Sequence, residues 1–282
     1  MAKSFVEFSR SYEDRLLIVD GLNLSFRWKH KGSTNFSDEF INTVKSLAKS
    51  YKCSKIIVAS DWGSSSYRKN LFPEYKGNRE DLRAKQTDQE KNAFKKFFEE
   101  YERTLMNVEI EGIPVVKYHG VEADDIAAWI VKNRLDYGID QVWLISSDRD
   151  WDLLLAEDVK RFSYVTRKES TLDNWSESYD FPHSQYITFK CLDGDKGDNV
   201  PGIPGIGPKR ASSLIEQFGD VFEIYDQCPM PGTQKFIQNL NSNYEQLLTN
   251  VELMDLLTYC DEAIGEENII DLRSKLKELM NV

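Results

Sequence analysis

Acidic residues that could hold divalent metal ions stand at five separate places in this 282-residue chain. Most of them follow a short apolar run, as Asp20 follows Leu16-Leu17-Ile18-Val19. The acids are Asp20, Asp61, Glu122, Asp124, Asp125, Asp148, Asp150, Asp195 and Asp198. In an open parallel sheet, ligands bind beyond the carboxyl ends of the strands, so acids that directly follow buried strands can converge on one crevice. The pattern therefore predicts a shared site for two divalent ions.

Such a site is suited to hydrolysis of phosphodiester bonds. Two divalent ions roughly 4 Å apart can divide the work, one generating hydroxide and the other stabilising the leaving oxygen. A ligand set made only of oxygens suits Mg²⁺, and Mn²⁺ is expected to substitute for it. This chemistry needs no nucleophilic side chain, and His30, His119 and His183 stand in no triad-like or metal-ligand pattern.

A second segment with a chemical signature runs from Gly194 to Lys209 and is rich in glycine and proline. A glycine-rich turn that leads into a helix presents unpaired amide groups, which suit a phosphate oxygen without reading any base. Lys209 and Arg210 stand in the first turn of the expected helix, the unfavourable end for a cation. An ordinary interdomain linker is the simpler alternative, but a phosphate contact accounts better for these two residues.

Apolar runs predict the strands that would position the acids. One run ends at Val19, a second begins at Ile56, and two more cover residues 113–116 and 142–145. Glu122, Asp124 and Asp125 stand at the start of an expected helix, where acids also complement the helix dipole. That simpler explanation weakens because the run at 142–145 is followed by Asp148 and Asp150, whose alternate spacing can direct both carboxylates to one ion.

Helical periodicity fills much of the remaining chain. Ser37 is expected to cap the helix that follows it, and Thr87-Asp88-Gln89-Glu90 fits a capping box. The aromatic residues of the second helix are expected to be packing residues, not a base-stacking platform; they are Phe94, Phe97, Phe98 and Tyr101. The polar segment 63–86 is too long and too charged for an ordinary connection, which predicts a functional role for it.

Composition and charge narrow the class of protein. Hydrophobic residues at 40% and aromatic residues at 12% indicate a globular chain, long enough for a catalytic domain and a smaller appended one. No apolar run approaches the ~20 residues that cross a bilayer, and Met1-Ala2-Lys3-Ser4 lacks the apolar core of a signal peptide, so a cytoplasmic location is expected. The cysteines are expected to be inert packing residues: Cys53, Cys191, Cys228 and Cys260.

The net charge of -11 argues at first against a nucleic-acid partner. Bound divalent ions would offset part of the acidic charge, however, and basic residues gather between Arg68 and Lys96 and again at Lys209 and Arg210. Solvated basic faces are the simpler explanation of those clusters. Charge alone does not choose between the two.

Five motifs occur in an order that resembles one known family. They are Ile18-Val19-Asp20-Gly21-Leu22-Asn23, Pro73-Glu74-Tyr75-Lys76-Gly77-Asn78-Arg79, Gly120-Val121-Glu122-Ala123-Asp124-Asp125, Ser146-Ser147-Asp148-Arg149-Asp150-Trp151-Asp152 and Gly194-Asp195-Lys196-Gly197-Asp198-Asn199. The chain resembles the bacteriophage 5' nucleases of the flap endonuclease superfamily, and it is similar also to the 5'-3' exonuclease domain of bacterial DNA polymerase I. The resemblance extends from Asp20 to about Gly219.

The resemblance implies an α/β fold, with a mostly parallel central sheet flanked by helices. It implies a metal-dependent nuclease domain at 1–185 with a helical arch at about 63–100, through which the free 5' strand passes. A helical DNA-binding subdomain at 186–282 would carry a helix-hairpin-helix-like motif at about 195–215. The tail beyond Gly219 carries no recognisable motif.

Site residues follow from the same resemblance. All nine acids match metal-ligand positions, with Glu122, Asp124, Asp148 and Asp150 nearer the first ion and Asp195 and Asp198 nearer the second. Lys76 and Arg79 match basic residues that reach the scissile phosphate, and Tyr75 beside them would stack on a base. The other expected DNA-binding residues are Arg27, Gly202, Gly205, Gly207, Lys209 and Arg210. The hairpin would also hold a monovalent cation such as K⁺, whereas Asp152 and Asp193 match no ligand position.

The implied function is a structure-specific 5' nuclease that cuts branched DNA at 5' flaps and acts as a 5'-3' exonuclease. Removal of RNA primers from an RNA-DNA hybrid stays open, and a monomer is expected. A phosphatase of the haloacid dehalogenase type would need an acid two residues after Asp20, where this chain has Leu22. A non-catalytic protein that binds branched DNA remains the alternative, and turnover with Mg²⁺ would separate the two.

Overall fold

Residues 15–281 are described by the structure, a computed structural model, and six strands within them form the central sheet. The strands are β1 (Arg15–Asp20), β2 (Lys55–Ala59), β3 (Val115–Val116), β4 (Gln141–Ile145), β5 (Val159–Ser163) and β6 (Lys168–Ser170). Their spatial order is β3-β2-β1-β4-β5-β6, and only the β5–β6 pair is antiparallel. The expectation of a mostly parallel sheet is confirmed. Met1-Ala2-Lys3-Ser4, used above to argue against a signal peptide, lies outside the described residues.

The strand order creates a topological switch point between β1 and β4. The chain builds outwards from β1 through β2 to β3, and then returns to the other side of β1 with β4 and β5. In the register of β1 and β4, Val19 lies opposite Ile145. Asp20 ends β1 and Asp148 follows β4, so both acids flank the place where open α/β sheets bind ligands.

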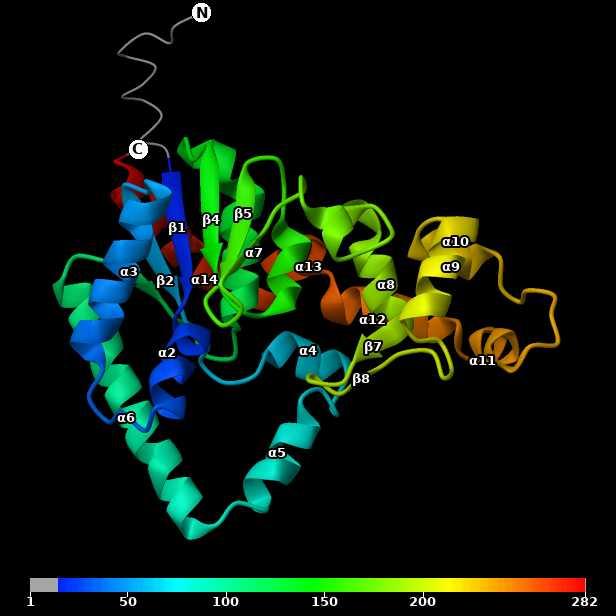
Figure 1. Cartoon of the computed structure of the whole chain (residues 1–282), viewed down its shortest axis with the longest axis horizontal. Helices are drawn as coiled ribbons and strands as arrows, with labels where there is room; N and C mark the ends of the chain where they lie inside the picture. Colours follow the sequence, from blue (N-terminus) through cyan, green and yellow to red (C-terminus); the bar gives the residue numbers. More distant parts are fainter. Residues whose placement is uncertain (1–14, 282) are drawn as a thin grey trace, which may run out of the picture.

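Helices cover both faces of the sheet (Figure 1). On one face, α2 (Gly21–His30), α3 (Ser37–Tyr51) and α6 (Asp88–Ile110) pack over Leu17, Val19 and Val58. On the other face, α7 (Ala123–Asn133), α13 (Leu256–Ile264) and α14 (Glu266–Met280) pack over Leu16, Ile18 and Ile57. Strands buried on both faces explain the continuous apolar runs in the sequence.

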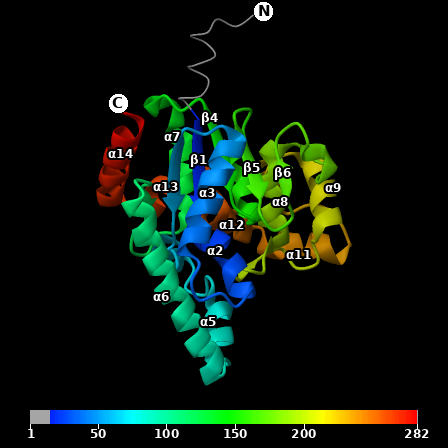
Figure 2. The same ribbon diagram turned by 60° about the vertical axis from the view of Figure 1, so that its left-hand side comes forward.

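An arch projects beyond the carboxyl end of the sheet. It consists of α4 (Ser66–Leu71), α5 (Gly77–Ala84) and the first half of α6; α5 and α6 meet at a tip far from the sheet, as a V in Figure 1 and side by side in Figure 2. The expected capping box is confirmed, because Thr87 accepts from the Glu90 amide and Glu90 accepts from the Thr87 amide. Phe97 and Tyr101 are buried beneath α2 and α3, while Phe94 stacks on Phe98, which agrees with a packing role.

The C-terminal helices begin beside the sheet and return to it. The first elements are α8 (Tyr186–Asp193), β7 (Gly194–Asp195), β8 (Val200–Pro201), α9 (Pro208–Phe218), α10 (Val221–Asp226), α11 (Lys235–Asn243) and α12 (Glu245–Met254). They lie to the right of the sheet in Figure 1, whereas α13 and α14 pack against the sheet through α7. Short 3-10 turns occur at Arg134–Tyr137, Arg149–Leu154, Trp175–Glu177 and His183–Gln185.

Two local expectations were wrong. Phe36, not Ser37, is the N-cap of α3, and the Phe36 and Ser37 amides donate to Glu100 Oε1 at 2.8 and 3.3 Å. A buried carboxylate from α6 therefore caps α3, and local sequence does not show such a partner. Strand β3 is also shorter than the run at 113–116, since only Val115 and Val116 pair with β2.

The helices and the cysteines bear on two of the expectations drawn from composition. Over residues 15–281, no helix combines the length and apolar character needed to cross a bilayer. Cys53, Cys191 and Cys260 are free and buried and Cys228 is free and half-buried, as packing cysteines would be.

Candidate metal centre

Three carboxylates, one buried (Asp20) and two half-buried (Asp61 and Asp124), lie at the crevice without forming a salt bridge among the described residues. Asp20 accepts from the Asn23 amide at 3.0 Å and from Ser146 Oγ at 2.8 Å. Asp61 accepts from the Ala123 amide at 2.6 Å, and Asp124 accepts from the indole of Trp151 at 2.6 Å. Each carboxylate is thus oriented by neutral donors. Lys76 and Arg79 offset the charge of Asp61 only in part, and Lys76 that of Asp124, in each case without a direct ion pair.

Burial and the crowding of these acids raise their pKa values. Burial, together with the charge of Asp61, raises the pKa of Asp20 to about 8. Burial and Glu122 raise the pKa of Asp61 to about 6, and burial, Asp148 and Asp61 raise the pKa of Asp124 well above its ordinary value. Like charges crowded in a poorly solvated crevice destabilise the ionised forms. A divalent cation would reverse that effect, so this donor set fits a metal centre.

A second group of acids is held by the base of the arch. Glu122 Oε1 accepts from Lys76 Nζ at 2.7 Å and from the Ser65 amide at 3.1 Å. Burial raises the pKa of Glu122, but Lys76 and Arg68 outweigh it and the net shift is downward. Lys76 is 8% exposed and lies 3.5 Å from Asp198, so one ammonium group joins acids from two segments.

A third group is organised by a lysine that sequence reasoning missed. Lys190 on α8 donates to both Asp150 and Asp195. Asp195 also accepts from the amides of Gly197 and Asp198 at 2.8 and 3.1 Å. Burial raises the pKa of Asp195, but Lys190 and these amides lower it overall. Lys190 stands in the last turn before Gly194, which was the only sequence signal for its role.

Asp148 and Asp150 form a turn at the end of β4. The Asp150 amide donates to Asp148 Oδ1 at 3.0 Å, so Asp148 caps the 3-10 turn Arg149–Leu154. Burial raises the pKa of Asp150, partly offset by Lys190. The turn brings both acids to the crevice, as their alternate spacing predicts.

Asp125 differs from the other expected ligands. It is fully buried, and Arg68 Nη1 and Nη2 donate to its two oxygens at 2.8 and 2.7 Å. Arg68 also donates from Nε to the Leu253 carbonyl at 2.7 Å, which ties α4 to the C-terminal helices. Both Asp125 oxygens face a guanidinium, so the geometry favours a structural role over the expected metal-ligand role.

The expectation that Tyr75 stacks on a base is wrong in this structure. Its side chain is buried, at 3% exposure, and its hydroxyl lies within hydrogen-bond distance of both Glu122 Oε2 (2.9 Å) and Asp198 Oδ2 (2.8 Å), to one of which it donates. A buried ring leaves no free face for a base. Tyr75 instead joins Glu122 and Asp198, the two acids of the second group.

The remaining basic residues of the expected site are more exposed. Arg79 donates to Asp198 at 2.6 Å with about half of its side chain exposed. Arg27 donates to the Tyr164 hydroxyl, and its guanidinium lies 4.4 Å from that ring's centroid. The structure thus places Arg79 in the acid cluster and Arg27 on α2 beside the β5–β6 connection.

The glycine-rich hairpin is built by close backbone contacts. A Cβ on Gly194 would lie 2.2 Å from the Gly202 nitrogen, and a Cβ on Gly202 would lie 2.3 Å from the Asp193 carbonyl. Gly205 has a positive φ of 84°, and its carbonyl accepts from Arg210, whose guanidinium lies 4.8 Å from the Phe236 ring centroid. Arg210 therefore has a structural partner that the sequence did not predict.

The start of α9 is open to solvent. Gly207 is its N-cap, without a side-chain hydrogen bond, and Pro208 occupies the first turn. Lys209 follows with an exposed side chain. A lysine at an exposed helix N-terminus suits a phosphate oxygen.

The acids do not close around a single point. In the part of the chain that the structure describes, no three acid, thiol or imidazole side chains converge closely enough to hold one ion together. Asp20, Asp61 and Asp124 are each held by a separate neutral donor, while Lys76 and Lys190 bind other acids of the cluster.

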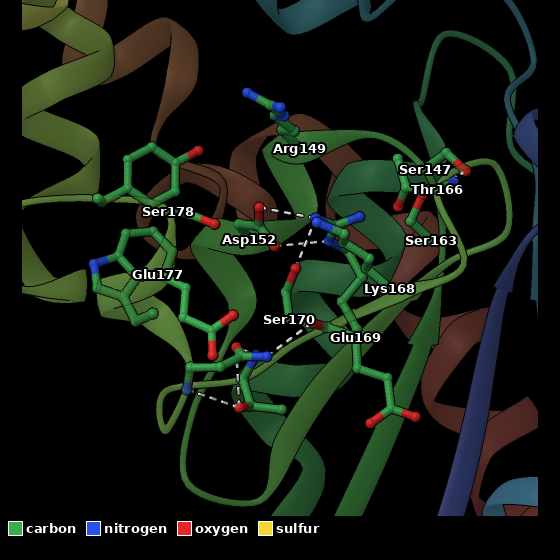
Figure 3. Close-up of a pocket in the computed structure, with 15 residues that line it drawn as sticks. Ser147, Arg149, Asp152, Ser163, Thr166, Lys168, Glu169, Ser170, Glu177 and Ser178 are labelled. Atoms are coloured by element: carbon green, nitrogen blue, oxygen red, sulfur yellow. Dashed lines mark hydrogen bonds and ion pairs between the residues drawn. The ribbon is translucent and has the colours of Figure 1, made fainter.

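A polar hollow of about 450 Å³ adjoins the crevice at Arg149. Its floor is the buried pair of Asp152 and Arg161, joined by contacts of 2.7 and 2.9 Å, whereas Arg149 points away from them (Figure 3). Asp152, which matched no ligand position, is thus committed to Arg161. The hollow lies beside the acid cluster and is separate from it.

Two family models together match most of the chain. The 5'-3' exonuclease N-terminal resolvase-like domain matches residues 15–180, and the 5'-3' exonuclease C-terminal SAM fold matches residues 181–275. A flap endonuclease of Escherichia phage T5 is 43% identical over 285 residues, covering 98% of this chain and 97% of that protein. A DNA polymerase I of Rhizobium leguminosarum is 26% identical over 266 residues, covering 87% of this chain but 25% of the polymerase.

Two solved structures from T5 resemble the chain closely. The T5 5'-exonuclease with bound zinc ions has a TM-score of 0.90 at 43% identity, covering 94% of this chain and 99% of that one. The T5 flap endonuclease in a pseudo-enzyme-product complex with DNA and metal ions has a TM-score of 0.90 at 42% identity, covering 95% and 100%.

Proposed function

This chain belongs to the 5'-3' exonuclease family, and from that premise we propose that it is a divalent-metal-dependent 5' nuclease acting on branched DNA. It cuts 5' flaps and removes nucleotides from 5' ends. The observation that carries the proposal is the set of carboxylates Asp20, Asp61 and Asp124 at the switch point of the sheet, which form no ion pair among the described residues and whose pKa values are all raised. A non-catalytic DNA-binding protein is not favoured, since crowded carboxylates destabilise the fold and repel DNA phosphates unless they bind metal ions.

Mg²⁺ is the proposed physiological ion, with Mn²⁺ as a substitute, because the donors are all oxygen. When bound, the ions supply a hydroxide nucleophile and stabilise the leaving oxygen. The ligands we propose are Asp20, Asp61, Glu122, Asp124, Asp148, Asp150, Asp195 and Asp198. Asp125 is left out of this set because Arg68 engages both of its oxygens.

Lys76 and Arg79 are proposed to bind the scissile phosphate and stabilise its developing negative charge. Burial lowers the pKa of Lys76, but Glu122 and Asp198 outweigh it and raise the pKa, so the ammonium stays protonated. Its backbone supports this placement, since the Lys76 amide donates to the Asp198 carbonyl at 2.8 Å. Lys76 is therefore held with its charge beside the acids, while Arg79 is more free to follow the substrate.

The duplex is proposed to bind along the hairpin 201–209. Gly202, Gly205 and Gly207 let the backbone approach phosphate oxygens, and Lys209 adds charge, with Arg210 shaping the turn. K⁺ is proposed to bind at this hairpin, and Arg27 is proposed to contact DNA from α2.

We also propose that the chain consists of a nuclease domain at 1–185 and a helical subdomain at 186–282. The protein is proposed to be a cytoplasmic monomer that acts on RNA-DNA hybrids as well.

The testing experiment is cleavage of a labelled 5'-flap duplex in Mg²⁺, against a matched reaction in EDTA. Cutting near the junction only with Mg²⁺ supports the proposal. Tight binding of the flap duplex with no cutting in Mg²⁺ or Mn²⁺ would overturn it in favour of the DNA-binding alternative.

A further inference from the structure

Trp62 directly follows the acid Asp61, yet its side chain is 51% exposed. Four other tryptophans are buried, at 0% to 7% exposure: Trp28, Trp129, Trp151 and Trp175. An exposed indole keeps about half of a large apolar surface free for a ligand, and this one is attached to the residue that follows a proposed metal ligand.

A second exposed ring lies against it. The His119 and Trp62 ring centroids are 5.4 Å apart with an interplanar angle of 79°, and Lys117 Nζ lies 5.6 Å from the indole centroid. Lys117 also pairs with Glu102, so its charge is largely committed. The chemical character of this surface is therefore aromatic, with one cation beside it.

The two rings are fixed to the loops that carry two of the proposed ligands. The Trp62 carbonyl accepts from the Gly120 amide at 2.8 Å, and the Trp62 amide donates to the Val121 carbonyl at 3.3 Å. Gly120 has a positive φ of 71°, and a Cβ there would lie 2.1 Å from Ser66 Oγ at the start of α4. The loops after β2 and β3 and the base of the arch therefore form one rigid unit beneath the rings.

This unit lies on one side of the crevice, and the hairpin lies on the other. Trp62 and His119 follow β2 and β3, which form one edge of the sheet, while α8 and α9 lie beyond β5 (Figure 1). A substrate held by its duplex at the hairpin and cut at the acids would place its unpaired 5' strand over the β2–β3 edge. Unpaired bases stack on aromatic side chains without sequence preference, which suits such a strand.

We propose that Trp62 and His119 form a stacking platform for unpaired bases of the 5' strand beyond the scissile phosphate. The inference rests on the proposed function and adds to it the place where the flap is held. Stacking there would orient the strand at the arch without reading its sequence.

Tryptophan fluorescence tests the platform without requiring turnover. An Asp148→Asn background prevents cutting, and three DNAs share one duplex: a nick, a six-thymidine 5' flap and a six-abasic 5' flap. The thymidine flap is expected to quench fluorescence more than the other two, and Trp62→Phe is expected to remove that difference. Equal quenching by the thymidine and abasic flaps, or an unchanged difference in Trp62→Phe, would overturn the platform.

Steady-state kinetics in the otherwise wild-type protein provide the second readout. Trp62→Ala is expected to raise KM for the thymidine flap about tenfold, with kcat within about twofold and little change for the abasic flap. Phe222→Ala is the matched control, since Phe222 is a 53% exposed aromatic residue on α10 and any effect there should be equal for all three DNAs. Equal effects of Trp62→Ala on both flaps would overturn the inference.

Failure of the inference can be told from failure of the function. If the wild-type protein does not cut flap DNA in Mg²⁺, the proposed function fails. If it cuts normally while Trp62→Phe and His119→Ala keep the full base-dependent quenching, only the platform fails.

Discussion

Arg68 and Asp125 form a doubly hydrogen-bonded ion pair inside the molecule, with contacts of 2.8 and 2.7 Å and exposures of 2% and 0%. The pair joins α4, at the base of the arch, to α7, which carries Asp124. Because Arg68 also bonds to the Leu253 carbonyl, three segments distant in sequence meet at one guanidinium. The arch is therefore mechanically connected to a proposed metal-binding helix.

The first prediction separates the structural role of Asp125 from a ligand role. Asp125→Asn should lower the free energy of unfolding by about 3 kcal/mol, because it removes the doubly hydrogen-bonded anion of a buried guanidinium and leaves only Glu122, 3.6 Å away. The number of Mn²⁺ ions bound, measured by calorimetry, should stay the same. Asp136→Asn, an exposed change, is the control. Wild-type stability with one Mn²⁺ fewer would instead make Asp125 a ligand.

The second prediction concerns Asp148 at the end of β4. Asp148→Asn should abolish cleavage of a 5'-flap duplex while DNA binding changes little, because a neutral amide is a poor ligand for a hard cation. Cleavage and gel-shift assays measure the two effects. Glu157→Gln, an exposed acid in the next loop, should cut normally. An Asp148→Asn protein that cuts at near the wild-type rate would remove Asp148 from the metal site.

The third prediction concerns Lys76 as a group that acts in the transition state. Lys76→Ala should lower kcat by about a hundredfold or more and change the dissociation constant for DNA far less. Single-turnover rates and binding isotherms separate the two quantities. Lys277→Ala on α14 is the control, since that lysine is exposed and far from the crevice. A loss of affinity with an unchanged cleavage rate would contradict the assigned role.

The sequence predicted the parts of the site that depend on strand ends. Asp20 and Asp148 follow strands that are neighbours at the switch point, and parallel strands bring their carboxyl ends to one edge. Acids after apolar runs therefore predicted a common crevice. The capping box at Thr87 was equally local, and the structure confirms it.

What the sequence did not predict depends on partners distant in the chain. Glu100 caps α3 across 64 residues, and Lys190 bridges Asp150 and Asp195 from another helix. Tyr75 was expected to stack on a base because it is aromatic and lies beside basic residues, but its position beneath the acids depends on the packing of the arch. Strands β5 and β6 were also missed, since β5 has only two apolar residues, Val159 and Phe162, and β6 (Lys168–Ser170) has none.

The fourth prediction is a pH dependence in the absence of metal. Burial raises the pKa of Asp20 from 3.8 to about 8, so the folded state keeps this proton over a range where the unfolded state releases it. The contribution of Asp20 to stability should therefore fall as pH rises from about 4 to about 8, and then level off. Urea denaturation in EDTA at several pH values measures it. Asp20→Asn should flatten the profile, and parallel profiles would contradict the assignment.

Bound Mg²⁺ should change the pH dependence of stability in the opposite direction, through the same Asp20 carboxylate. Mg²⁺ binds the ionised carboxylates, so its stabilising effect should grow as pH rises through this range. The rise in Tm on adding Mg²⁺ should be larger at pH 8 than at pH 5.5. In Asp20→Asn the difference should be smaller.

The fifth prediction concerns the hairpin. Gly202→Ala should destabilise the protein by about 1–3 kcal/mol and weaken flap-duplex binding, because the new Cβ would lie 2.3 Å from the Asp193 carbonyl and must push two backbone segments apart. Gly207→Ala is the matched control, since its Cβ would meet its nearest atom, Asp193 Oδ1, at 3.9 Å. The control should unfold like the wild type. If both variants unfold alike, the contact between Gly194 and Gly202 does not hold the hairpin. If only Gly202→Ala is destabilised, yet it binds flap-duplex DNA normally, the hairpin is not the duplex-binding element.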